Sequence, residues 1–196
     1  MPASVDGKRP AVFIDRDGTL HRELARPLET PADLELFEGV AAAVGRLNRA
    51  GFWVVVVTNQ SAVARGWIDP AQLERVHAAL TERLAMAGAH IDLFLHCPHH
   101  PTEGYPPYRR ECACRKPLPG LLLEAERRLP IARAGSWMIG DASRDLAAAR
   151  ALDVPGILVA TGKGERELPL LEAAGTPPEH YVPGLAAAVD LILAQR

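Results

Sequence analysis

The sequence has no strong excess of one charge and no long hydrophobic stretch. Its 22 lysine and arginine residues stand against 24 aspartate and glutamate residues, a formal net charge of −2. This balance offers no overall basic surface to a nucleic-acid backbone, so we expect no nucleic-acid partner. No stretch approaches the roughly 20 apolar residues that a membrane-spanning helix needs. We therefore expect no membrane partner.

The first residues also lack a signal-peptide pattern, in which a charged segment precedes an apolar one. We expect a cytoplasmic protein on this ground. Cysteine is scarce as well: the three cysteines, an odd number, are confined to positions 97–114. Such a set does not form a disulfide framework, and in a reducing compartment it is more typical of metal ligation.

What the sequence does have is an alternation of apolar strands and amphipathic helices. Its 196 residues, 48% of them hydrophobic, can bury the core of one domain, so we expect a single domain over 1–196. The expected strands are 11–14, 52–57, 91–95, 137–139 and 156–159. The expected helices are 39–50, 69–88, 119–129, 145–152 and 185–195, with a short helix opening at 165–167. The alternation predicts an α/β, Rossmann-like, doubly wound parallel sheet with helices on both faces.

Two aspartates directly follow the first expected strand. Asp15 and Asp17 are separated by one residue and followed by Gly18. In open parallel sheets, ligands bind beyond the carboxyl ends of the strands. One carboxylate there could hold a hard cation and act as a nucleophile, while the other transfers a proton. Taken alone, the motif is also compatible with an acidic surface turn.

Polar groups follow the other strands, or precede helices, in a pattern that fits one phosphate site. These residues are Thr58, Asn59, Arg115, Lys116, Asp141 and Asp145. Hydroxyl, amide and ammonium groups can hold phosphate oxygens, and the two aspartates can hold a divalent cation. Each motif also has a plainer interpretation as a polar turn, a solvated basic pair or a helix cap. Their occurrence together, in this order, favours a shared site.

The irregular stretch 97–116 contains every cysteine of the chain. A Cys-x-His pair is followed by a Cys-x-Cys pair, formed by Cys97, His99, Cys112 and Cys114. Three thiolates and one imidazole make a closed, structural zinc site. His100 is a competing imidazole, and a cluster of free thiols is the alternative. We expect zinc to order this loop and to place Arg115 and Lys116.

The order Asp-x-Asp-Gly-Thr, Thr-Asn-Gln, Lys and Gly-Asp-x-x-x-Asp resembles the haloacid dehalogenase superfamily of phosphohydrolases. The resemblance implies a magnesium-dependent phosphomonoester hydrolase that passes through an aspartyl-phosphate. Asp15 would be the nucleophile and Asp17 the general acid and base. Thr58 and Lys116 would hold the phosphoryl group. Magnesium would be bound by Asp15, Asp17 and Asp141, with Asp145 in support.

The loop motifs Cys-Pro-His-His-Pro and Cys-x-Cys-Arg-Lys-Pro narrow the resemblance. They are similar to those of the D-glycero-D-manno-heptose 1,7-bisphosphate 7-phosphatases, which act in lipopolysaccharide precursor synthesis, and of the histidinol-phosphate phosphatases. This implies a small phosphorylated metabolite as substrate, no large cap domain, and His99 as the zinc imidazole. Arg115 would contact substrate, and Asn59 would frame the phosphate site. We expect a monomer.

Two positions depart from these families. His21 stands where relatives often have asparagine, and Ala160 stands where they often have an arginine near the distal end of the substrate. Arg65 could reach the substrate or be solvated. The alternatives to a heptose bisphosphatase are a histidinol-phosphate phosphatase, a nucleic-acid 3′-phosphatase, and an inactive, zinc-stabilised binding module.

Overall fold

The computed structural model describes residues 7–195. The strands are β1 Arg9–Ile14, β2 Trp53–Asn59, β3 Leu93–Cys97, β4 Ile131–Gly140, β5 Gly156–Val159 and β6 His180–Val182. The helices are η2 Pro31–Asp33, α1 Val40–Arg49, α2 Pro70–Met86, α3 Gly120–Arg128, α4 Ser143–Arg150, α5 Gly164–Ala173 and α6 Leu185–Ala194. None of these helices combines the length and apolar character needed to cross a bilayer. The expected lack of a leader concerns residues that fall mainly within 1–6, outside the described part of the chain.

The strands form one parallel sheet in the order β3-β2-β1-β4-β5-β6. On β1, Val12 pairs with Val54 of β2 on one side and with Trp137 of β4 on the other. The chain therefore winds outward from β1 to one edge and then from β4 to the other edge. The direction reverses between β1 and β4, where open α/β sheets bind their ligands.

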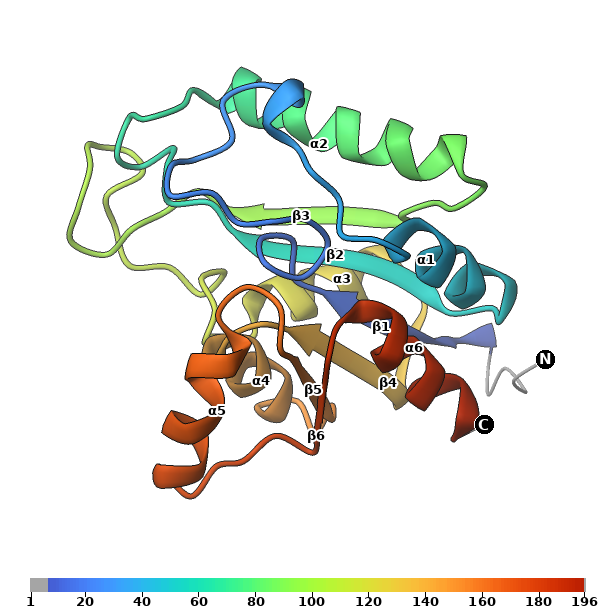
Figure 1. Cartoon of the computed structure of the whole chain (residues 1–196). Coiled ribbons are helices and arrows are strands. Elements are labelled where there is room, and N and C mark those ends of the chain that lie inside the picture. Colours follow the sequence, from blue (N-terminus) through green and yellow to red (C-terminus); the bar gives the residue numbers. More distant parts are fainter. Residues whose placement is uncertain (1–6, 196) are drawn as a thin grey trace.

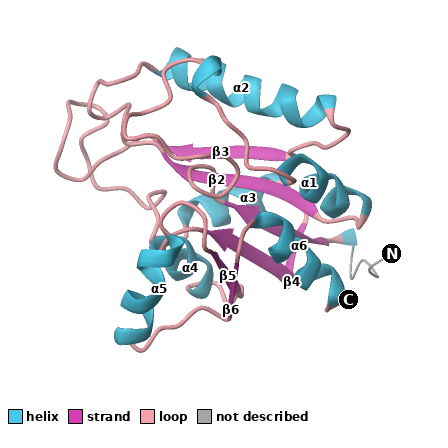
Figure 2. Cartoon of the chain, in the orientation of Figure 1, coloured by secondary structure: helices cyan, strands magenta, loops and turns pink. Residues whose placement is uncertain are grey.

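Helices cover both faces of the sheet (Figures 1 and 2). Side chains of one strand alternate between the faces. Val12 and Ile14 pack into the core under α1, α2 and α6. Ala11 and Phe13 pack into the core under α3 and α4. Burial on both faces explains why the strands appear in the sequence as almost continuous apolar runs, and it confirms the predicted fold class.

The largest differences from the expected elements lie where the apolar signal is weak. β4 begins at Ile131, six residues before the expected start, and its register against β1 shifts between Pro10 and Val12. The partly exposed edge strand β6 was not predicted. β3 extends to Cys97, and α4 begins at Ser143 rather than at Asp145. Asp145 instead lies in the first turn of α4, where its Oδ2 accepts a hydrogen bond from the Ala142 N–H at 3.2 Å.

Short segments rather than a second domain surround the carboxyl edge of the sheet. Between β1 and α1, the described chain contains only the three-residue helix η2. The longer loop between β3 and α3 covers the same edge (Figure 1). This agrees with the predicted absence of a large cap domain.

Candidate functional site

A lysine and an aspartate form the centre of the site. Asp15 is the first residue after β1, and 2% of its surface is exposed. Lys116 Nζ donates to Asp15 Oδ1 at 2.8 Å and to the Val57 carbonyl oxygen at 2.7 Å, and it lies 2.6 Å from Asp145 Oδ1. Burial alone would lower the pKa of Lys116, but the carboxylates of Asp145 and Asp15 outweigh burial and raise it. Lys116 is therefore a fixed cation.

Three carboxylates converge beside this lysine. One oxygen each from Asp15, Asp141 and Asp145 lies within 4.8 Å of the others, and all three residues are buried. Asp141 Oδ1 has no hydrogen-bond partner among the described residues. Burial, together with the charges of Asp15 and Asp145, raises the pKa of Asp141 to about 7. Two cations face the cluster, Lys116 and Arg144; burial would lower their pKa values, but the carboxylates outweigh burial and raise them. They are fewer than the three carboxylates, so the cluster fits a divalent cation with oxygen ligands, such as Mg²⁺.

Two glycines let the backbone close around Asp141. Gly18 has φ +78° and Gly162 has φ +62°, in the left-handed region that favours glycine. A Cβ atom on either one would lie 2.2 Å from Asp141 Oδ2. The same oxygen accepts the Lys163 backbone N–H at 2.9 Å. The turns after β1 and β5 thus fix the Asp141 carboxylate, with its Oδ1 left free.

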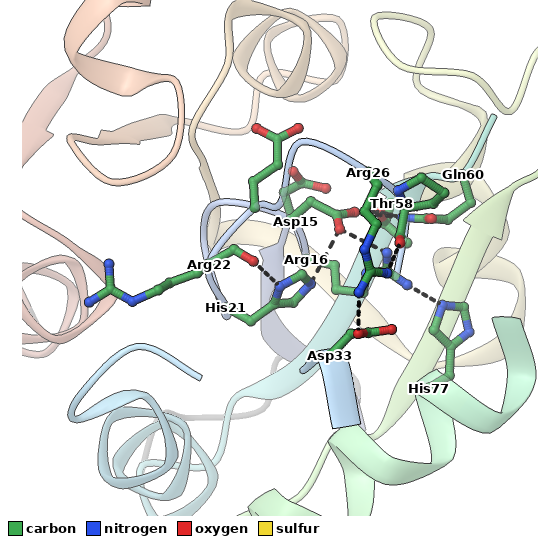
Figure 3. A network of polar contacts seen from close by, with 12 residues as sticks. Asp15, Arg16, His21, Arg22, Arg26, Asp33, Thr58, Gln60 and His77 are labelled. Carbon is green, nitrogen blue, oxygen red and sulfur yellow. Dashed lines mark hydrogen bonds and ion pairs between the residues drawn. The ribbon is translucent and has the colours of Figure 1, made fainter. Parts of the chain in front are cut away.

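Asp17 lies next to this centre and has four polar neighbours. Figure 3 labels these neighbours, which are Arg16, His21, Thr58 and Gln60. Its Oδ1 accepts from Arg16 Nη2 at 2.8 Å and lies 3.2 Å from His21 Nε2. Its Oδ2 accepts from Gln60 Nε2 at 2.6 Å and from Thr58 Oγ1 at 3.3 Å. Burial raises the pKa of Asp17, but the charge of Arg16 and the contacts with His21 together outweigh it and hold the pKa well below its usual range. The side chain remains 22% exposed, so it can exchange a proton with a bound ligand.

Asn59 and Arg115 connect the lysine to its surroundings. The Asn59 amide donates to the Lys116 carbonyl oxygen at 2.9 Å and accepts from the Lys116 N–H at 3.1 Å. This pair of bonds ties the end of β2 to the loop that carries the lysine. Arg115 Nη1 donates to the His99 carbonyl oxygen at 3.1 Å. Burial is the main cause that lowers the pKa of Arg115.

The four predicted loop ligands form a compact cluster. Cys97 Sγ lies 3.5 Å from Cys112 Sγ and 3.3 Å from Cys114 Sγ, and His99 Nδ1 lies 3.4 Å from Cys114 Sγ. A Zn–S bond of about 2.3 Å gives an edge of about 3.8 Å for a tetrahedral site. The cluster is therefore compatible with zinc after a small expansion. His100 is not part of it, because its Nδ1 accepts the Glu103 N–H at 2.9 Å.

The thiols of this cluster are electrostatically coupled. The side-chain contact with Cys97 is the largest cause that lowers the pKa of Cys114, to about 5, while the same contact raises the pKa of Cys97. A thiolate is the form that ligates metal, and Cys114 already favours it.

A cavity of about 220 Å³ opens beside Asp17. Its lining includes Arg16, Asn59, Gln60, Ser61 and Arg65. Arg65 donates to Ser61 Oγ at 2.6 Å and to Glu103 Oε2 at 2.7 Å. Arg65 therefore belongs to the cavity wall, where it can meet a substrate.

Several known proteins are similar to this chain. A family model described as HAD-hydrolase-like matches residues 113–188. The D-glycero-beta-D-manno-heptose-1,7-bisphosphate 7-phosphatase of Pseudomonas aeruginosa is 39% identical over 160 residues, covering 82% of this chain and 86% of that protein. The enzyme of the same name from Escherichia coli K12 is 42% identical over 155 residues, covering 79% and 81%. The chain belongs to the heptose bisphosphate phosphatase family of haloacid dehalogenase-like hydrolases.

A solved structure of the same family is also similar to this phosphatase. The D,D-heptose 1,7-bisphosphate phosphatase from B. bronchiseptica, complexed with magnesium and phosphate, matches with a TM-score of 0.83 and 35% identity. The match covers 95% of this chain and 99% of that one. As a family member the chain is a phosphoric monoester hydrolase, and the predicted superfamily and reaction class are confirmed.

Sequence reasoning did not find every residue that shapes the phosphatase site. It assigned no role to Arg16, which is 2% exposed, or to the buried His77 of α2, yet the two are in contact. The available signal was the position of Arg16 between two aspartates in a turn after a buried strand. A guanidinium there must find acceptors, and the second acceptor lies 61 residues away on another element.

Proposed function

We propose that this phosphatase removes the 7-phosphate of D-glycero-β-D-manno-heptose 1,7-bisphosphate, in lipopolysaccharide precursor synthesis. The observation that carries the chemistry is the Lys116 ammonium, 2.8 Å from Asp15 in a cluster of buried carboxylates. A phosphomonoester dianion repels an anionic nucleophile, and cations must offset that repulsion before attack. Substrate identity follows from membership of the family.

In the first step, an Asp15 carboxylate oxygen attacks phosphorus in line. A bond forms between Asp15 and phosphorus, and the bond from phosphorus to the sugar O7 breaks. The incoming phosphate dianion repels the Asp17 carboxylate and favours its protonation. Asp17 then gives this proton to O7, so the sugar leaves as an alcohol. Lys116 and Thr58 hold the phosphoryl oxygens.

In the second step, Asp17 takes a proton from a water molecule. The water oxygen attacks phosphorus, and the acyl-phosphate bond to Asp15 breaks. Inorganic phosphate leaves and Asp15 is regenerated. Two effects together accelerate both steps: the alignment of the reacting atoms and the preorganised charge of the site.

Magnesium would be held by Asp15, the Asp17 backbone carbonyl and Asp141, with Asp145 in support. When bound, magnesium would supply positive charge that offsets the repulsion of the phosphate dianion by the carboxylate nucleophile. The free Oδ1 of Asp141 supports this assignment.

A structural zinc ion would be held within the loop 97–116 by Cys97, His99, Cys112 and Cys114. Reduced thiol ligands suit the cytoplasm, where we propose that the enzyme acts. The enzyme would be a monomer with one catalytic domain over 1–196, in which this loop is inserted. Arg115 and Asn59 would frame the substrate and the phosphate site.

The test is phosphate release with Mg²⁺ from three substrates: the heptose bisphosphate, histidinol phosphate and a 3′-phosphorylated oligonucleotide. We expect kcat/KM for the heptose bisphosphate to exceed the others at least about 100-fold, a difference of roughly 3 kcal/mol in transition-state binding. A preference for histidinol phosphate would refute the substrate assignment. Absence of turnover on all three, or full turnover by Asp15→Asn, would refute the mechanism.

A further inference from the structure

Arg16 is a buried arginine that links the active site to helix α2. Its Nη2 donates to Asp17 Oδ1 at 2.8 Å, and its Nη1 donates to His77 Nε2 at 3.0 Å (Figure 3). Its Nε has no hydrogen-bond partner among the described residues. Only 2% of the residue is exposed, so water cannot replace a lost contact. The orientation of the guanidinium therefore depends on one carboxylate and one imidazole.

The imidazole of His77 is held rigidly. His77 is 5% exposed and lies on the inner side of α2, with Leu73 and Leu80. Its ring stacks on Phe94 of β3, with centroids 4.0 Å apart and an interplanar angle of 26°. Stacking and burial leave the ring little freedom to turn, so its Nε2 is a fixed acceptor.

The contact with Arg16 also sets the tautomer of His77. A guanidinium has donors and no acceptor, so Nε2 must present its lone pair. The ring proton of the neutral imidazole then lies on Nδ1, which is 3.8 Å from Glu74 Oε1. Burial and the charge of Arg16 lower the pKa of His77 to about 2, which keeps the ring neutral.

This tautomer argues against a metal site at the same place. Ligand atoms of Glu74, His77 and His96 lie within 4.8 Å of one another, a geometry that could hold an ion. The nitrogen of His77 that faces Glu74 is Nδ1, and a protonated nitrogen cannot ligate a metal. If Nδ1 ligated a metal, the ring proton would have to lie on Nε2. Two donors, Nε2 and Arg16 Nη1, would then face each other without an acceptor.

We propose that His77 is a positioning residue for the reaction: it fixes the Arg16 guanidinium against Asp17 and so orients the carboxyl group that protonates the leaving oxygen. The proposal rests on the role of Asp17 given under the proposed function. Without His77 as acceptor, the buried Nη1 loses its partner and the guanidinium must turn toward another one. Asp17 Oδ1 then loses its shortest contact, and proton transfer to the leaving group becomes misaligned.

The experiment compares two leaving groups, because only one of them needs the proton. The sugar alkoxide of the heptose bisphosphate requires protonation, whereas the phenolate of 4-nitrophenyl phosphate leaves without it. We expect His77→Leu to lower kcat/KM about 10- to 100-fold on the heptose ester, within the range of general acid catalysis, and less than about 3-fold on the aryl ester. The comparison uses kcat/KM because this quantity ends with release of the leaving group, whereas kcat also includes hydrolysis of the aspartyl-phosphate, which is common to both esters and also uses Asp17.

Three further variants make the result specific. His77→Gln places an acceptor oxygen near the position of Nε2, so this variant should restore most of the kcat/KM on the heptose ester. His77→Asn, one methylene shorter, should behave like His77→Leu and replaces it if that variant does not fold. Glu74→Gln removes the exposed carboxylate and should leave both rates unchanged.

Equal losses of kcat/KM on both esters would overturn the proposal, as would full activity of His77→Leu or failure of His77→Gln to recover. A second zinc ion per chain, lost in Glu74→Gln, would show a metal site instead. If the wild type cleaves other alkyl phosphates but not the heptose bisphosphate, the substrate assignment fails. The leaving-group comparison is then made on the alkyl ester that it does cleave.

Discussion

Lys116 is the residue on which the local charge balance depends. It is almost fully buried, and its ammonium group contacts the carboxylates of Asp15 and Asp145. Removing one partner of a buried ion pair leaves an uncompensated charge, which costs more than the pair itself contributes. The same ammonium would face the transferring phosphoryl group. Stability and catalysis should therefore respond together to its loss.

We predict that Lys116→Met lowers kcat at least about 1,000-fold and the free energy of unfolding by roughly 3 kcal/mol in the absence of magnesium. Saturating Mg²⁺ should recover part of the stability, because it offsets the uncompensated charge of the buried carboxylates. Denaturant titrations with and without Mg²⁺ measure this. Lys163→Met is the stability control, since its ion pair with Glu23 is solvent-accessible and should contribute less than about 1 kcal/mol. Equal stabilities of the two variants would contradict the prediction.

His77 should make folding stability depend on pH. Its ordinary pKa is about 6.5, and in the folded protein burial, Arg16 and His96 lower it to about 2, against a small opposing effect of Asp17; Glu74 also faces the ring. Between these values the unfolded chain takes up a proton and the folded chain does not. Stability from this group is therefore complete above about pH 6.5 and is lost as the pH falls.

At about pH 5 the loss should reach roughly 2 kcal/mol. Denaturant titrations of the wild type and of His77→Gln at about pH 7.5 and pH 5 isolate the contribution. We expect the variant to lose about 2 kcal/mol less than the wild type over this interval. The same pH dependence in both proteins would contradict a buried, neutral His77.

At the scale of elements, the site depends on how closely the turns after the strands approach one another. The turn after β1 and the turn after β5 meet at Asp141, and this contact is made by Gly18 and Gly162. The loop between β3 and α3 carries the Cys/His cluster, which places Cys97 at the end of β3 beside Cys112 and Cys114. Close backbone packing holds the two turns together, and the proposed zinc ion would hold this loop.

We predict that Gly18→Ala reduces kcat at least about 100-fold and weakens the apparent affinity for Mg²⁺, because the new methyl group must displace the Asp141 carboxylate. Gly175→Ala is the matched control: Gly175 has φ +69°, and nothing lies within 4 Å of a Cβ atom there. Both variants bear the left-handed strain of about 1–2 kcal/mol. The control should therefore lose stability and keep its activity, and an equal loss of activity in the two variants would count against the close approach.

We also predict that Cys112→Ser loses bound zinc and lowers kcat about 10-fold or more, because the loop no longer places Arg115 and Lys116. Metal analysis of the purified protein and steady-state kinetics test this together. His100→Gln should retain one zinc per chain, since His100 lies outside the cluster. Zinc retained by Cys112→Ser, or lost by His100→Gln, would refute the ligand assignment.

For the whole molecule, the sequence predicts the sheet better than it predicts the contacts at its edge. Continuous apolar runs such as that of β2 identify buried parallel strands, and Asp69-Pro70 marks the start of α2. The beginning of β4 and the edge strand β6 were not predicted, because their residues are partly exposed and carry no apolar pattern. The periodicity of apolar residues indicates which side chains are buried. It therefore does not identify a strand that is held mainly by backbone hydrogen bonds.

The same distinction applies to the site. Parallel topology brings the carboxyl ends of β1, β2 and β4 together, so the order of the motifs was enough to predict that Asp15, Lys116 and Asp141 meet. It could not predict that Arg16 would reach His77, because that contact depends on the height of α2 above the sheet and on side-chain rotamers. A buried polar group needs a hydrogen-bond partner, but the residues around it in the sequence do not identify a partner that is distant along the chain. Tertiary packing decides which residue that partner is.

The proposed mechanism requires a covalent bond between Asp15 and phosphorus. Rapid acid quench during turnover of the heptose bisphosphate with Mg²⁺, followed by mass spectrometry of the peptide that contains Asp15, tests this directly. We predict one phosphoryl group on Asp15 at early times in the wild type and none in Asp15→Asn, which should also lack turnover. An unmodified Asp15 peptide at every time point, while phosphate is being released, would contradict the account.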